Sequence, residues 1–138
     1  MLVRLIYASR TEANEAQLAD ILRRSRAHNT QAGLTGLLCH SDGWFVQVLE
    51  GGRSAVNALY NSIVRDPRHR EVTLLSYGEI GERRFAGWAM GQVQLARLNP
   101  ALVLKYAPTT RLDPFELSGT ALEALFEELI STGAIACS

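Results

Sequence analysis

The chain has 138 residues, of which 47% are hydrophobic, and this is enough for one domain with its own core. Its 14 basic and 14 acidic side chains cancel, so we expect no direct binding to nucleic acid, which usually requires a strong positive charge. No apolar run approaches the ~20 residues that cross a bilayer, and the first segment carries Arg4 without an export cleavage site, so we expect a cytoplasmic protein with no membrane contact.

The first two predicted elements are a strand and a helix. Apolar side chains alternate over residues 2–8, which predicts a strand that is buried on both faces. Apolar residues then recur at helical spacing over residues 14–28, and Asn14 with Gln17 forms the pattern of a capping box. We therefore expect this helix to begin at Asn14.

A hairpin and a second helix follow. Residues 33–39 and 44–50 are rich in strand formers and are joined by an Asp-Gly turn, so the two strands should pair antiparallel. Ser54 is placed to cap a helix, and Asp66-Pro67 should end it, because the residue before a proline disfavours helical geometry.

Two more strands and a last helix complete the prediction. The strands cover residues 72–77 and 88–95. Past Pro100 the chain loses strand character, and Thr120 with Glu123 then forms a capping pattern ahead of a helix with one apolar side. This helix should cover the sheet or bind a partner.

The order β-α-β-β-α-β-β predicts an α+β fold of the ferredoxin-like kind. Two helices should lie on one face of the sheet, with the first and third strands side by side at its centre. We expect one domain over residues 1–97 and a C-terminal helical extension over 98–138. The two cysteines, Cys39 and Cys137, should be free thiols, and the histidines and cysteines lack the spacing of a metal site.

Two polar residues fall on a face that is otherwise apolar. If the first and third strands are neighbours, Tyr7 and Gln47 lie close together among apolar side chains. A buried amide without a hydrogen bond costs ~1–3 kcal/mol, so Gln47 requires a partner. Two explanations remain open: Tyr7 and Gln47 satisfy each other or a buried water, or they bind a ligand.

Other polar residues have ordinary explanations when taken singly. Asn29 is common at helix ends, and Arg68 and His69 lie in a loop where charged side chains are usually solvated. Trp88 and Met90 are two residues apart on one predicted strand, so they should share a face and pack in the core.

These residues belong to five motifs that follow one another over roughly the first two-thirds of the chain. The motifs are Tyr7-Ala8-Ser9, Asn29 ahead of Gly33-Leu34-Thr35-Gly36-Leu37-Leu38, Phe45-Val46-Gln47-Val48-Leu49-Glu50-Gly51, Asp66-Pro67-Arg68-His69, and Arg84-Phe85-Ala86-Gly87-Trp88-Ala89-Met90-Gly91. In order and spacing they resemble the BLUF family of blue-light receptors that use flavin.

The resemblance implies a flavin, FAD or alternatively FMN, held between the two helices on the face that carries Tyr7 and Gln47. It places Asn29 at the polar edge of the isoalloxazine ring, where an amide matches an imide that both donates and accepts. Arg68 would donate to a ring carbonyl. The neighbouring histidines, His28 and His69, are further candidates for cofactor binding.

The mechanism implied by the resemblance is photochemical and not enzymatic. The excited flavin oxidises Tyr7, Gln47 relays a proton, and recombination leaves the glutamine rearranged, which shifts the flavin absorption to the red until it recovers in the dark. Trp88 and Met90 are candidates for passing this change to the C-terminal helix. The output then requires a separate, unidentified downstream signalling protein, and we expect a homo-oligomer.

Two other functions explain part of the pattern. A flavin-free regulatory or scaffolding domain would have this fold, but it would have no use for Tyr7, Asn29 and Gln47 between its helices. An acylphosphatase-like hydrolase would use Arg68 and Asn29, but Ser9-Arg10-Thr11 follows the first strand in place of a glycine-rich phosphate loop. Colour separates these functions, because only the photoreceptor is yellow.

Overall fold

The structure is a computed structural model and describes residues 1–41, 43–94 and 98–132. Four expectations fall outside these residues: Asp42 in the hairpin turn, Leu95 at the end of the last strand, the domain boundary after residue 97, and the free thiol of Cys137. Cys39 is a buried free thiol.

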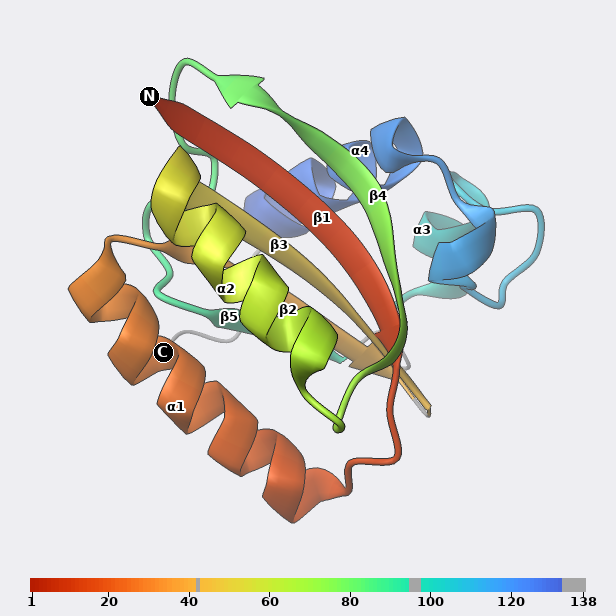
Figure 1. Ribbon diagram of the computed structural model, residues 1–138. Helices are drawn as coiled ribbons and strands as arrows, with labels where there is room; N and C mark the ends of the chain where they lie inside the picture. The colour runs from red at the N-terminus through yellow and green to blue at the C-terminus, as the bar shows by residue number, and fades with distance from the viewer. Residues whose placement is uncertain (42, 95–97, 133–138) are drawn as a thin grey trace.

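Five strands form one mixed sheet (Figure 1). They are β1 (Leu2–Arg10), β2 (Thr35–Ser41), β3 (Trp44–Gly52), β4 (Arg70–Ile80) and β5 (Gly91–Gln94). Their order in the sheet is β4-β1-β3-β2-β5. β1 is antiparallel to β3 and β4, β2 is antiparallel to β3, and β5 runs parallel to β2. The ferredoxin-like α+β prediction is confirmed, including the central pairing of the first and third strands.

Two helices, α1 (Glu15–Ala32) and α2 (Arg53–Arg65), cover one face of this sheet (Figure 1). α1 begins with the predicted capping box, in which Asn14 Oδ1 accepts from the Gln17 N–H at 2.8 Å and Gln17 Oε1 accepts from the Asn14 N–H at 2.9 Å. The helix runs one turn further than predicted and ends at Gly33, whose φ of 72° lies in the left-handed region that glycine tolerates.

The start of α2 differs from the prediction. The helix ends before Asp66 as expected, but it follows β3 directly, with Gly52 at its N-cap and no side-chain hydrogen bond there. Ser54 therefore lies within the first turn, and the prediction that it caps the helix was wrong. The physical reason is that β3 continues beyond its predicted end at residue 50, through Gly51 and Gly52, so the helix begins directly after it.

The C-terminal segment holds more helix than predicted. It contains α3 (Pro100–Leu104), a short 3-10 helix (Pro114–Glu116) and α4 (Gly119–Thr132). The cap of α4 is Ser118, whose Oγ accepts from the Ala121 N–H at 3.1 Å, so the predicted cap at Thr120 was wrong.

The sheet separates two apolar cores. Alternation along β1 sends Val3 and Tyr7 to the core under α1 and α2, and Ile6 to the core under α4. The second core includes four side chains of α4 that are at most 1% exposed: Leu122, Leu125, Phe126 and Leu129. The apolar side of α4 therefore packs on the sheet.

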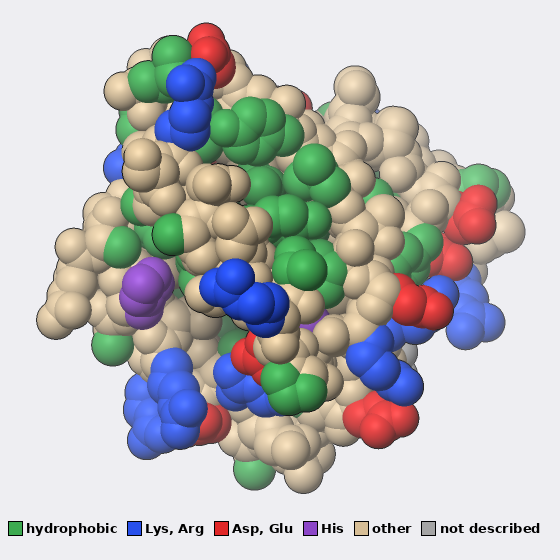
Figure 2. Space-filling model, in the orientation of Figure 1, with side chains coloured by type: hydrophobic (Ala, Val, Ile, Leu, Met, Phe, Trp, Pro, Cys, Tyr) green, Lys and Arg blue, Asp and Glu red, His purple; other side chains and the backbone are tan. Residues whose placement is uncertain are grey.

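Figure 2 shows the face that carries α1 and α2, where hydrophobic side chains gather in the upper middle and most of the charged side chains lie below them. The large apolar residues that remain exposed include Val64 on α2 and Leu74 and Tyr77 on β4. Among the helices of the described residues, none combines the length and the apolar character needed to span a membrane.

Candidate functional site

Tyr7 and Gln47 lie opposite each other on β1 and β3, where their Cα atoms are register partners. The Tyr7 hydroxyl donates a hydrogen bond to Gln47 Oε1, and both side chains are buried. Burial raises the pKa of Tyr7, so the phenol stays protonated and remains a donor. The sequence left open whether these two side chains satisfy each other, and the structure contains this bond.

The other end of the Gln47 amide faces Met90. Gln47 Nε2 lies 3.5 Å from Met90 Sδ, in donor geometry. Met90 belongs to the core under α1 and α2, whereas Trp88 packs against the core under α4. The expectation that these two residues share a strand and a face was wrong, because both precede β5, which begins at Gly91, and the backbone there lacks the alternation of a strand.

Asn29 is fully buried in the last turn of α1. Its position is fixed by its backbone carbonyl, which accepts from the N–H groups of Gly33 and Leu34 at the end of the helix. Its side-chain Nδ2 donates to the carbonyl of Ala89 at 2.8 Å. Its Oδ1 is buried and has no hydrogen-bond partner among the described residues, at a cost of ~1–3 kcal/mol. This oxygen is therefore available to a ligand that donates.

A groove of about 220 Å³ lies between α1 and α2 and ends on β2 and β3. Its lining includes most of the candidate residues: His28, Asn29, Gln47, Arg68 and His69. Tyr7 adjoins the groove through its hydrogen bond to Gln47. The structure thus brings together side chains from α1, β3 and the loop after α2.

Arg68 lines the rim of the groove and is held by Asp66 from its own loop. Its Nη2 is 2.7 Å from Asp66 Oδ2, and the two side chains are 41% and 23% exposed. The hydrogen bond from Arg68 lowers the pKa of Asp66, so this carboxylate stays ionised and restrains the guanidinium. Arg68 therefore presents a fixed positive charge at the rim.

His69 is packed more deeply than His28, which is exposed on α1. His69 Nδ1 is 2.8 Å from Ser9 Oγ, and the imidazole ring lies 5.5 Å from the Phe45 ring and 6.1 Å from the Tyr7 ring, between centroids. Burial lowers the pKa of His69, which favours the neutral ring. Ser9 is buried as well, and sequence reasoning did not assign it this contact, although it shares the face of Tyr7 two residues away.

Sequence reasoning also missed Arg26 and Glu50. Arg26 Nε donates to the backbone carbonyl of Met90 at 3.1 Å. The only sequence signal for Arg26 is its position one turn before Asn29, which places both on one side of α1.

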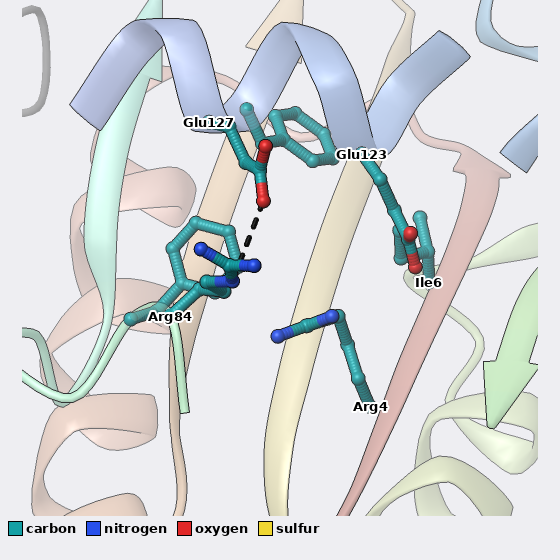
Figure 3. A pocket seen from close by; sticks show the side chains of 7 residues that line it. Arg4, Ile6, Arg84, Glu123 and Glu127 are labelled. Atoms are coloured by element: carbon teal, nitrogen blue, oxygen red, sulfur yellow. Dashed lines mark ion pairs between the residues drawn. The ribbon is translucent and has the colours of Figure 1, made fainter. Parts of the chain in front are cut away.

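Glu50 is fully buried on the α4 side of the sheet. It accepts from Arg4 Nε at 2.9 Å and from the N–H groups of Arg84 and Phe85 at 3.0 and 2.9 Å, so it fixes the loop between β4 and β5. Figure 3 shows this side, with Arg4 and Arg84 below α4 and Arg84 paired to Glu127 at 3.4 Å.

A family model described as BLUF, sensors of blue-light using FAD, matches residues 2–91. Among curated proteins, the photoactivated adenylate cyclase subunit beta of Euglena gracilis is 44% identical over 66 residues, which are 48% of this chain and 8% of that protein. The chain therefore spans less than a tenth of the length of this relative.

Solved structures match over nearly the whole chain. The photo-activated state of BlsA has a TM-score of 0.85 and 34% identity, covering 94% of this chain and 95% of that one. The dark state of the BLUF protein BlrB has a TM-score of 0.79 and 35% identity, covering 96% of each chain. Klebsiella pneumoniae BlrP1, solved with FMN and cyclic diGMP, has a TM-score of 0.70 and 30% identity, covering 96% of this chain and 35% of that one.

Proposed function

Because the chain belongs to the BLUF family of blue-light sensors using FAD, we propose that it reports light through a change in the hydrogen bonds of Gln47. Residues 2–91 form a flavin-binding photosensor and not an enzyme. A light response through Gln47 is supported above all by the buried series of contacts from Tyr7 through Gln47 to Met90.

The groove fits the ring of a flavin. The isoalloxazine ring has an imide edge with one N–H between two carbonyls, and the buried, unpaired Asn29 Oδ1 is an acceptor for such an N–H. The Arg68 guanidinium can donate to a ring carbonyl from the rim, and His28 and His69 border the same space. FAD and FMN share this ring, so the same residues would hold either cofactor.

Tyr7 and Gln47 are arranged for coupled transfer of an electron and a proton. When bound, the flavin supplies an excited state under blue light that takes an electron from a nearby phenol. Tyr7 is the donor, and the loss of an electron makes its phenol strongly acidic. Its proton then moves to Gln47 Oε1, which already accepts the hydroxyl hydrogen bond. Return of the electron and proton restores the Tyr7 phenol.

The rearranged state follows from the geometry of Gln47. Its Oε1 faces Tyr7 and its Nε2 faces the Met90 thioether, so rotation or tautomerisation of the amide exchanges a donor for an acceptor at both ends. Met90 meets the amide directly, and Trp88, two residues earlier, contacts the other core. We propose that these two residues pass the change across the sheet toward α4.

The output of this sensor is a further part of the proposal. We propose that a separate signalling protein reads it, and that the chain acts as a homo-oligomer. The flavin-free scaffold is disfavoured because it leaves Asn29 Oδ1 buried and unpaired. The hydrolase is disfavoured because Ser9-Arg10-Thr11 stands at the end of β1 in place of a glycine-rich phosphate loop.

Absorption spectroscopy tests the proposed function. The purified protein should be yellow, its flavin bands should shift to the red under blue light, and they should return in darkness. A colourless protein that also fails to take up added FAD or FMN would refute the proposal, and so would a bound flavin whose bands stay fixed under illumination.

A further inference from the structure

Three consecutive carbonyls precede β5, and each one accepts a hydrogen bond from a different residue. The carbonyl of Trp88 accepts from the Gly36 N–H at 3.1 Å. The carbonyl of Ala89 accepts from Asn29 Nδ2 at 2.8 Å, and that of Met90 accepts from Arg26 Nε at 3.1 Å. Because these residues form neither helix nor strand, the bonds from outside decide where residues 88–90 lie.

Two of these three donors are side chains of α1. Arg26 and Asn29 are three residues apart, so they project from the same side of the helix. Arg26 is half-buried, whereas its neighbours Arg23 and Arg24 are 76% and 70% exposed and pair with Asp20 on the helix surface. Arg26 thus differs from the adjacent arginines in having a backbone carbonyl as its partner.

We propose that Arg26 is a positioning residue for the photocycle, which holds the Met90 thioether against the amide of Gln47. The inference rests on the proposed function and adds a residue to it. Met90 is fully buried, and its Sδ accepts from Gln47 Nε2, so Met90 forms one wall of the space in which the amide turns. The bond from Arg26 fixes the backbone of that wall.

This arrangement sets the direction of the kinetic effect. For dark recovery the Gln47 amide must turn back, and the Met90 thioether must make room for this turn before Gln47 Nε2 donates to it again. Met90 resists this movement more when its backbone is held by the charge-assisted hydrogen bond from Arg26 than when that bond is absent. Loss of the Arg26 bond should therefore lower the barrier and accelerate dark recovery.

The position of Met90 can be measured without light. The chain has two methionines, of which Met1 is 70% exposed and Met90 is buried, so methyl-labelled protein gives two distinct NMR signals. In Arg26→Ala the Met90 methyl signal should move toward that of an exposed methionine or broaden, whereas in Arg23→Ala it should stay in place. An unchanged Met90 signal in Arg26→Ala would overturn the inference.

Dark recovery gives the second measurement. Arg26→Ala should recover about threefold faster or more, Arg26→Lys should lie closer to the unsubstituted protein because lysine can still donate to the carbonyl, and Arg23→Ala should match it. A rate in Arg26→Ala that is unchanged or slower would overturn the inference. If the unsubstituted protein shows no light-induced shift, the proposed function fails, and the methyl signal alone then decides the role of Arg26.

Discussion

The amide of Gln47 has a different kind of neighbour at each end, so its two orientations make different hydrogen bonds. A phenol hydroxyl donates to its oxygen, and a thioether accepts from its nitrogen. An amide turned by half a rotation would change the Tyr7 hydroxyl from donor to acceptor and would set Gln47 Oε1, an acceptor, against the Met90 thioether, which is also an acceptor. The two orientations therefore differ in energy, as a switch requires.

Replacing Tyr7 by Phe tests the electron donor. The aromatic ring still fills its place in the core, so Tyr7→Phe should bind flavin, but it should lose the reversible red shift. Loss of the hydroxyl leaves Gln47 Oε1 without its donor and should cost ~1–2 kcal/mol of stability. Tyr60→Phe is the matched control, because the Tyr60 ring lies 5.8 Å from that of Tyr7, and it should keep the shift. A full photocycle in Tyr7→Phe would remove this residue from the mechanism.

His69 gives the protein a pH dependence of stability. Burial lowers its pKa below the usual value of 6.5, so the unfolded chain binds a proton more readily than the folded one. Stability should therefore fall as pH drops below about 6.5 and should level off below the folded pKa. Urea unfolding at pH 8, 7, 6 and 5 measures this, and His69→Gln should flatten the profile in that range. The exposed His28→Gln is the control, and an equal flattening there would contradict the assignment.

Local elements follow from local signals, and this is why the sequence predicts α1 so well. Its capping box, its apolar spacing and the glycine after it lie within one stretch of chain. The start of β5 had no comparable signal, because Trp88 and Met90 read as an alternating strand until contacts with α1 and β2 are known. Arg26 and Met90 are 64 residues apart, and no local pattern reports such a contact.

Among the functional residues, the strand pairing predicts some partners, whereas others lie in a loop that the sequence pattern does not place. Tyr7 and Gln47 could be paired from the sequence because the topology makes β1 and β3 neighbours and the face is otherwise apolar. Arg4, the register partner of Glu50 on β1, could be paired with it in the same way, but its other partners could not, since the N–H groups of Arg84 and Phe85 belong to a loop that carries no regular structure. Polar residues that bind backbone atoms leave no trace in the pattern of side chains.

Replacing Glu50 tests how the loop between β4 and β5 is held. Donors from four residues converge on the Glu50 carboxylate: Arg4, Thr35, Arg84 and Phe85. An amide has only one acceptor oxygen, so Glu50→Gln sets a donor against a donor. The free energy of unfolding should fall by about 2–4 kcal/mol. Glu79→Gln is the control, because its ion pair with Arg53 is exposed. Losing that pair should lower the free energy of unfolding by less than ~1 kcal/mol. Chemical denaturation measures both, and equal losses would contradict the assigned role.

At the scale of the whole molecule, the sheet is enclosed by helices on both faces. α1 and α2 border the groove, and α4 closes the opposite side with side chains that are at most 1% exposed (Figure 1). Packing this complete makes α4 part of the folded unit. The exposed apolar residues Val64, Leu74 and Tyr77 lie on α2 and β4.

Shortening Phe126 tests whether α4 is integral to stability. Phe126 is 1% exposed, and Phe126→Ala should lower the free energy of unfolding by about 3–5 kcal/mol through the cavity it leaves. The red shift should persist in the folded fraction, because Phe126 and Tyr7 belong to different cores. Leu104→Ala, at a side chain that is 51% exposed, should change stability by no more than ~0.5 kcal/mol. A loss in Phe126→Ala as small as that of the control would mean that α4 is not integral.

The division into two cores has a practical consequence for engineering. A designer could rebuild the layer that contains α4, for instance to fuse a new effector. The colour and the photochemistry of the face that carries α1 and α2 would stay intact. The short stretch from Phe85 to Met90 is the exception, because Phe85 is buried in the core under α4 and Met90 in the core under α1 and α2. A grafted effector should therefore be joined with this stretch unaltered.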